Sequence, residues 1–218
     1  MPKKKRADLA RESLNREPSF ENGKIGPCGI MILAGPEKKP FLIHKDLVAH
    51  YSPYFRFMIE GHPWRAWVAG EDSSIPLEDV NPATVGLFQQ WLYSSKLPNP
   101  VCDRPHDDIH YTRSDIEATS LHKTVLLYTF AEQYDTPALK LATMNWILRY
   151  VTVNFMFCYP WYETVIVAFA KLEENDPLRR LFIELYADRW TGFEEDAQLR
   201  CAPRLPSDFT YGVMKLKG

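Results

Sequence analysis

The chain has 218 residues, 45% of them hydrophobic and 13% aromatic, and its formal net charge at pH 7 is −2. This composition supports a sizeable apolar core and excludes disorder for most of the chain. The small net charge excludes a global field that would attract nucleic acid or acidic membranes. No apolar run approaches the roughly 20 residues that cross a bilayer, and no apolar segment follows the basic start as in a secretory signal. We therefore expect an intracellular protein without membrane or direct nucleic-acid partners.

Residues 1–24 are expected to form a disordered basic tail, because they hold seven basic and four acidic side chains and almost no periodic apolar residues. At its start Lys3, Lys4, Lys5 and Arg6 stand in a row. A nuclear import receptor can read a cluster of this kind, although short basic runs also occur as solvated chain ends. Two locations therefore stay open, the nucleus through this cluster and the cytoplasm.

Three short apolar segments predict the strands of a small sheet. Residues 28–34, CGIMILA, are followed by Gly35-Pro36 and indicate a buried strand before a turn. Residues 40–43 return as a second strand, so we expect the two segments to pair as a hairpin. The segment SIPL, residues 74–77, is the candidate for a third strand.

Four residue pairs mark predicted helix starts, because each places a good N-cap residue before a proline, which is tolerated at the first helical position. They are Ser52-Pro53, Asn81-Pro82, Thr136-Pro137 and Asp176-Pro177. Apolar residues at helical spacing follow each pair. Residues 121–134 are more apolar and are expected to form a central helix. The element order predicts an α+β fold, in which a three-stranded sheet is capped by a cluster of helices.

Residues 95–120 interrupt this pattern with three prolines and few apolar residues, so we expect a polar insertion there. Cys102, His106 and His110 are zinc-ligand types, and the spacing of the two histidines recurs in zinc sites. Pro105 argues against a helix that would place both rings on one face, and a fourth ligand is missing unless a nearby aspartate serves. Two interpretations of the insertion therefore stay open. It could hold the metal of a small metal-dependent enzyme, or it could be an insert whose histidines are incidental.

Other signatures of catalysis are missing from the sequence. It holds no G-x-S-x-G, no Gly-rich phosphate loop and no H-E-x-x-H. It also lacks a zinc-finger or RNA-binding signature. His44 and Asp46 could form a catalytic or metal pair, but a single histidine with no second His or Cys nearby is more often structural. We expect no enzyme activity, no cofactor and no bound metal.

Three segments resemble the BTB/POZ domain: IHKDLVAHYSPYF (43–55), IPLEDVNPATVGLFQQWLYSSKLP (75–98) and LYTFAEQYDTPALKLATMNWI (127–147). Two later segments, DPLRRLFIELYADRW and LPSDFTYGVMKLKG, resemble the C-terminal extension of BTB proteins of filamentous fungi. The resemblance implies a BTB/POZ fold over residues 25–150, with the insertion at 95–120. It also implies a helical C-terminal extension over residues 151–218.

The resemblance further implies a non-enzymatic protein–protein interaction module that forms a homodimer and recruits partners. Its interface would involve the end of the first helix and the start of the second, and His44 would be a structural residue where the second strand meets the first helix. Trp64 is added to the expected interface as the apolar residue of a cullin-binding motif. The expected interface residues are Ala49, His50, Tyr51, Tyr54 and Trp64.

Two departures from the family pattern bear on the partners. Lys45 keeps the basic residue of a charge pair found in repressor-type members, but the acidic position falls on Cys28 or Gly29, which weakens the case for transcription regulation through a co-repressor pocket. In the stretch WRAW, residues 64–67, Ala66 replaces the glutamate of the cullin-binding motif. A substrate adaptor of a cullin-based ubiquitin ligase therefore stays an alternative function, with a cullin scaffold as partner.

Overall fold

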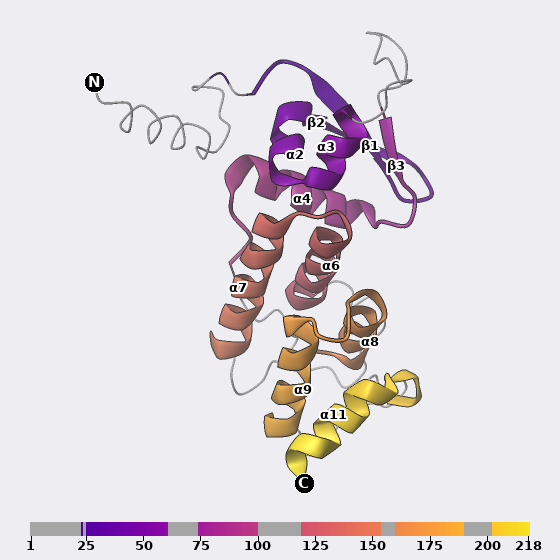
Figure 1. Cartoon of the computed structure of the whole chain (residues 1–218), viewed down its shortest axis with the longest axis vertical. Coiled ribbons are helices and arrows are strands. Elements are labelled where there is room, and N and C mark those ends of the chain that lie inside the picture. Colours follow the sequence, from indigo (N-terminus) through magenta and orange to yellow (C-terminus); the bar gives the residue numbers. More distant parts are fainter. Residues whose placement is uncertain (1–22, 24, 61–73, 100–118, 154–159, 190–201) are drawn as a thin grey trace, which may run out of the picture.

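The computed structural model describes residues 23, 25–60, 74–99, 119–153, 160–189 and 202–218 (Figure 1). Within these residues it has one three-stranded sheet, eight α-helices and one short 3-10 helix. The strands are β1 (Gly29–Ala34), β2 (Lys39–His44) and β3 (Ser74–Leu77). The helices are α2 (Lys45–Tyr51), α3 (Pro53–Glu60), α4 (Pro82–Ser94), α6 (Ser120–Gln133), α7 (Pro137–Val153), α8 (Tyr162–Lys171), α9 (Pro177–Arg189), η1 (Ala202–Arg204) and α11 (Ser207–Lys217).

The sheet has the order β2-β1-β3 and is mixed. β1 and β2 form the expected antiparallel hairpin, in which Ile30 lies opposite Ile43 and Ile32 lies opposite Phe41. β3 pairs with β1 in parallel, so the chain crosses over through α2 and α3 before it returns to the sheet. Gly35 has φ 72°, and this left-handed conformation in the turn between β1 and β2 favours glycine.

The free edge of β2 is covered by side chains of α4. The carbonyl of Leu42 accepts a hydrogen bond from the Gln89 amide at 2.8 Å, and the N–H of His44 donates to the hydroxyl of Tyr93 at 3.1 Å. Outward-facing backbone groups alternate along an antiparallel strand, so Pro40 shares this edge, and proline has no N–H to offer. Side chains of α4 therefore engage two of the outward backbone groups of β2.

The predicted helix starts are confirmed. α3, α4, α7 and α9 each begin at the proline of one predicted pair. At three of them, oxygens of Ser52, Asn81 and Asp176 accept backbone N–H groups of the first turn, as N-caps do. At the fourth, the hydroxyl of Thr136 donates to the carbonyl of Tyr134.

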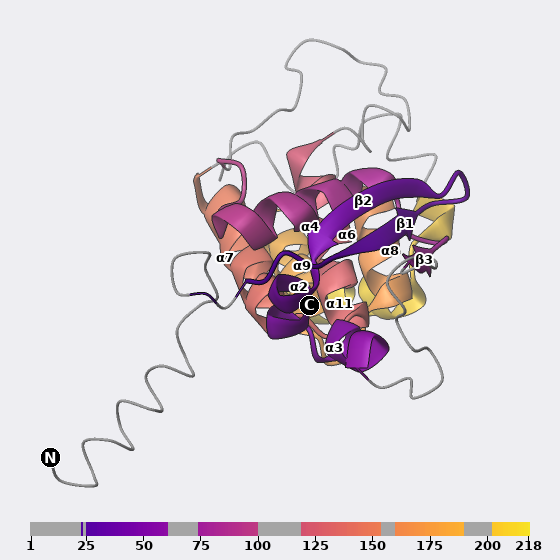
Figure 2. The same ribbon diagram turned by 90° about the horizontal axis from the view of Figure 1, so that it is seen from above.

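Two apolar clusters share α6, which is the central helix that its composition predicts. One face of α6 places Leu127 and Phe130 among side chains of the sheet, α2, α3 and α4. The other face places Val125 and Tyr128 among side chains of α7, α8, α9 and α11. The molecule thus extends from the sheet at one end to α11 at the other (Figure 1). Seen from above, the sheet, α2 and α3 lie over the remaining helices (Figure 2).

The expected segment boundaries fall within packed structure. α7 continues through residues 150 and 151 to Val153, so the expected start of the C-terminal extension lies inside a helix. At the start of the expected insertion, Leu97 packs against both clusters, and the carbonyl of Pro98 accepts a hydrogen bond from the Trp146 indole. The expected tail and most of the expected insertion lie outside the described residues.

Candidate protein-interaction surface

The corner between α2 and α3 is held by hydrogen bonds from two side chains. The buried hydroxyl of Ser52 donates to the carbonyl of Tyr134 at 2.6 Å and accepts the N–H of Phe55 at 3.0 Å. The Nε of Arg56 donates to the carbonyl of Ala49 at 2.9 Å, which satisfies a backbone acceptor in the last turn of α2. These contacts fix the two helices relative to each other and to the end of α6.

Two aromatic side chains of α3 reach the surface at this corner. Tyr54 is 37% exposed and Phe57 is 63% exposed, and because they are three residues apart they share one face of the helix. The Tyr54 ring also lies edge-on to the buried Tyr134 ring, with 5.2 Å between the centroids. The core therefore supports Tyr54 from one side, while its other side is open to a partner. Tyrosine and phenylalanine are enriched in the cores of protein interfaces.

Four of the expected interface residues lie in the described part of this corner. Ala49 is half-buried, whereas His50 and Tyr54 are exposed. Tyr51 is half-buried, and its ring lies 5.0 Å from the ring of Trp91 in the first apolar cluster, so it also anchors α2. Their use as an interface stays a prediction.

Phe57 was not expected from the sequence, although its spacing of three residues from Tyr54 is a signal that could have found it. The remaining expected site residues lie outside the described residues; they are Trp64, Ala66, the basic cluster Lys3, Lys4, Lys5 and Arg6, and the set Cys102, His106 and His110. Among the residues that the structure does describe, no group of three or more His, Cys, Asp or Glu side chains could hold a metal ion. In that same part of the chain, no helix combines the length and the apolar character needed to cross a membrane.

His44 lies at the junction between strand and helix, as expected. It ends β2 and is the N-cap residue of α2, and its Nδ1 lies 2.7 Å from the hydroxyl of Tyr93. The carboxylate of Asp46 instead accepts the backbone N–H of Gly26 at 2.8 Å. The two side chains have these separate structural partners, which favours the structural interpretation of His44 over a catalytic pair.

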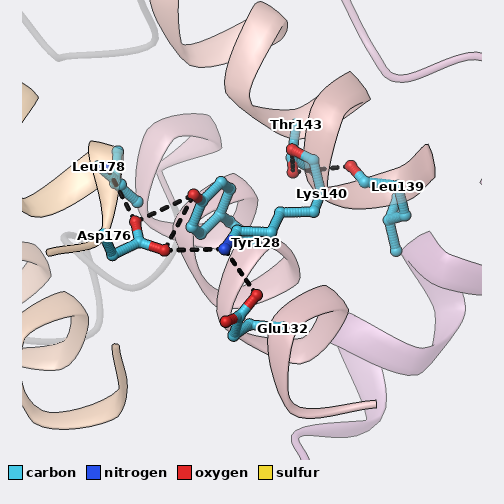
Figure 3. A network of polar contacts seen from close by, with 7 residues as sticks. All are labelled: Tyr128, Glu132, Leu139, Lys140, Thr143, Asp176 and Leu178. Carbon is cyan, nitrogen blue, oxygen red and sulfur yellow. Dashed lines mark hydrogen bonds and ion pairs between the residues drawn. The ribbon is translucent and has the colours of Figure 1, made fainter. Parts of the chain in front are cut away.

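A buried polar network joins α6, α7 and the start of α9 (Figure 3). Asp176 is its centre, with a side chain that is only 3% exposed. Its carboxylate accepts hydrogen bonds from the Tyr128 hydroxyl at 2.9 Å, the Lys140 ammonium at 2.8 Å and the N–H of Leu178 at 2.8 Å. Lys140 also forms an ion pair with Glu132 at 2.6 Å. The network therefore ties the C-terminal helices to the helix that both apolar clusters share.

The contacts of the network determine its protonation. Burial raises the pKa of Tyr128 above its ordinary value, and the neighbouring Asp176 carboxylate raises it further, so the hydroxyl stays a donor. Burial by itself would lower the pKa of Lys140, but hydrogen bonds to Asp176 and Glu132 outweigh burial, and the pKa lies above its ordinary value. Each of these four side chains has a polar partner, which indicates a structural role for the network.

A cavity of about 250 Å³ lies between the turn that precedes α4, the side of α6 and α8. Two buried titratable side chains, His122 and Glu163, belong to its wall. The Nδ1 of His122 lies 2.9 Å from the Thr164 hydroxyl, and Glu163 forms an ion pair with Arg204 at 3.1 Å. The other charged side chains around the cavity carry both signs, so their charge favours no single class of ligand.

No curated protein matches this sequence. The family model of the BTB/POZ domain matches residues 18–129, which is just over half of the chain. The match covers the sheet, α2, α3, α4 and most of α6, and it therefore includes the corner that exposes Tyr54 and Phe57. From this match and the mixed sheet capped by helices, we conclude that the chain belongs to the BTB/POZ domain family.

Proposed function

We propose that this protein is a non-enzymatic recruitment module that forms a homodimer through the α2–α3 corner. BTB/POZ domains are known protein–protein interaction modules, and they also mediate dimerisation. The observation that carries the proposal is the pair of exposed rings, Tyr54 and Phe57, on a corner that Ser52 and Arg56 hold in place. A preformed surface loses little conformational freedom on association, and tyrosine is enriched among the residues that dominate binding energy.

The mass in solution, measured by size exclusion with light scattering, tests the homodimer. We expect the wild type near twice the chain mass of 25.3 kDa. Tyr54→Glu and Phe57→Glu should each shift the protein to the mass of one chain, because an unpaired carboxylate buried in an interface is strongly unfavourable.

Leu141→Glu supplies the matched control for this experiment. Leu141 is 63% exposed, as Phe57 is, but it belongs to α7 and not to the two helices of the corner. This variant should keep the mass of the dimer, and circular dichroism should show that all three variants are folded. A wild type that stays monomeric at high concentration would rule out the homodimer, and corner variants that remain dimeric would rule out this interface.

We also propose the division into a tail at residues 1–24, a BTB/POZ unit at residues 25–150 and a C-terminal extension at residues 151–218. The apolar cluster that α7, α8, α9 and α11 form with α6 supports an extension that packs directly on the BTB/POZ unit. The likeness of the extension to BTB proteins of filamentous fungi belongs to this proposal and rests on the two segments quoted above.

Nuclear import through Lys3, Lys4, Lys5 and Arg6 is a separate proposal, supported by the uninterrupted run of four positive charges. Replacing Lys4 and Lys5 with alanine should spread a fluorescent fusion of the full chain from the nucleus into the cytoplasm. A fusion whose distribution does not change after the replacement would count against the signal.

We do not assign the two alternative functions to this protein. A cullin adaptor role has no supporting observation among the described residues, and Ala66 stands where the motif has glutamate. A metal-dependent enzyme built on Cys102, His106 and His110 likewise has no observation in its favour.

A further inference from the structure

A groove of about 320 Å³ lies between α7 and the segment that follows α4. Residues 95–99 form one of its walls. The other wall is one face of α7, on which Ala142, Asn145, Trp146 and Arg149 follow helical spacing. Neither α2 nor α3 contributes a residue to the groove, so it shares no residue with the corner proposed for dimerisation.

The walls of the groove are held in place by hydrogen bonds and by a buried ring. The Trp146 indole donates to the carbonyl of Pro98, and its ring stacks on the buried Tyr150 ring with 5.2 Å between the centroids. The N–H of Lys96 donates to the hydroxyl of Ser94, the last residue of α4, at 3.2 Å. A partner would therefore meet a preformed groove and would not have to order it.

The two charged side chains that line the groove are both cations. Lys96 stands on one wall and Arg149 on the other, and both residues are exposed. Within the described part of the chain, neither forms an ion pair with a carboxylate. The sequences of α4, residues 95–99 and α7 contain no Asp or Glu. No carboxylate of these segments therefore offsets the two positive charges.

Two exposed leucines of α7 lie beside the groove. Leu141 is 63% exposed and Leu148 is 39% exposed. Asn145 lines the groove and is four residues after Leu141 and three before Leu148, so the three side chains share one face of the helix. Arg149 is four residues after Asn145 and borders the same face. The surface is thus apolar along α7 and basic inside the groove.

Building on the proposed recruitment function, we propose that this groove binds an acidic segment of a partner protein. One carboxylate of the segment lies between Lys96 and Arg149, with the Asn145 amide as a further donor, and a neighbouring apolar side chain rests on Leu141 and Leu148. Two cations without local carboxylates favour an anionic side chain, and complementary charge steers the segment to the groove. Recruitment then uses residues that the dimer corner does not contain.

Three other occupants fit the observations less well. A single-stranded nucleic acid stacks its bases on aromatic rings, but the one aromatic side chain of the groove, Trp146, is only 6% exposed and already stacked. A small molecule is ordinarily buried over most of its surface, whereas Lys96 and Arg149 are exposed. A second copy paired about a two-fold axis would bring the same cations of both chains together, and they would repel.

A library of random peptides displayed on phage supplies the probe. The library is first depleted on the double variant Lys96→Glu with Arg149→Glu, shown to be folded by circular dichroism. This step removes peptides that bind elsewhere, and the library is then selected on the wild-type chain. We expect the enriched peptides to carry Asp or Glu beside an apolar residue. Failure to enrich peptides, or enrichment of peptides without acidic residues, would overturn the proposal.

A synthetic copy of one enriched peptide measures how much each part of the groove contributes. Its dissociation constant should rise about tenfold or more in the double variant. Asn145→Asp keeps the size of the side chain but places a carboxylate in the groove, so it should also weaken binding. Leu141→Ser with Leu148→Ser should weaken binding by removing the apolar contact, and added salt should weaken binding to the wild type.

Lys171→Glu with Lys215→Glu is the matched control. It changes the net charge of the chain by the same amount as the groove variant, but on α8 and α11, which contribute no residue to the groove. The peptide should bind this control almost as tightly as it binds the wild type. An equal loss of affinity in the control would show that the peptide responds only to net charge, and the groove would not be its site.

Two further outcomes would also overturn the proposal, each in favour of another occupant. The first is binding of an oligothymidylate to the wild type, but not to the groove variant, without peptide binding. The second is a dimer that the groove variant loses and that Tyr54→Glu keeps, which would contradict the α2–α3 dimer as well. A wild type that is monomeric but binds the peptide would rule out the homodimer alone, whereas failed peptide enrichment leaves that dimer intact.

Discussion

Replacing Asp176 with alanine should lower the free energy of unfolding by about 3 kcal/mol. The substitution removes the acceptor for Tyr128, Lys140 and the first turn of α9 in a single step. Removing one partner of a buried ion pair costs roughly 3–5 kcal/mol, and Lys140 falls at the low end because its side chain is 26% exposed and can recruit water. Urea unfolding followed by tryptophan fluorescence and by circular dichroism measures the loss.

Two further variants test whether the stability lost in Asp176→Ala comes from the buried network and not from the loss of a surface charge. Asp176→Asn keeps an oxygen for the N-cap but loses the negative charge, so its destabilisation should lie between the wild type and the alanine variant. Arg180→Ala removes an ion pair with Glu184 whose side chains are 82% and 49% exposed, and should cost less than about 0.5 kcal/mol. An alanine variant at Asp176 as stable as Arg180→Ala would show that the network does not secure the C-terminal helices.

Replacing Phe55 with alanine should destabilise the protein by about 3–5 kcal/mol. Phe55 is fully buried, and its ring stacks with Tyr134 at 5.6 Å and with Phe88 at 6.0 Å between centroids. These contacts seat α3 on α4 and on the end of α6, so the cavity left by alanine also loosens the corner that carries Tyr54. We therefore expect weaker self-association together with the lower unfolding free energy, measured by urea unfolding and light scattering on the same samples.

Phe57→Ala is the matched control, because it removes the same ring two positions later from a site that is 63% exposed. It should lower the unfolding free energy by much less than Phe55→Ala does and still weaken the dimer. If Phe57→Ala destabilises the fold as strongly as Phe55→Ala, then Phe57 belongs to the core and the corner is not a free surface.

The elements that local sequence determines were predictable. Asn81-Pro82 encodes the start of α4 within two residues, since the asparagine caps the helix and the proline fits its first position. The β1–β2 hairpin follows from two apolar segments on either side of Gly35, and SIPL is β3 over the same four residues. The dense apolar composition of α6 likewise indicated a helix with partners on two sides.

The contacts between distant segments could not be predicted in the same way. Asp176 was expected only as an N-cap. Its hydrogen bond with Tyr128 could not be predicted from the neighbouring residues, because Tyr128 is 48 positions away in the chain. The parallel pairing of β3 with β1 depends on the crossover and leaves no local pattern. Phe57 was missed because no local pattern separates it from its buried neighbour Phe55, and only the packing of α3 shows that its side chain is 63% exposed.

The covered edge of β2 limits the ways in which copies of this protein can associate. A bare strand edge invites another strand, and the added strand offers a new bare edge, so growth has no natural end and leads to ribbons and fibrils. Here Gln89 and Tyr93 use the Leu42 and His44 groups that such growth would need, and Pro40 offers no donor. Strand addition on this side of the sheet is therefore disfavoured, whereas association through helical surfaces can close at a fixed number of copies.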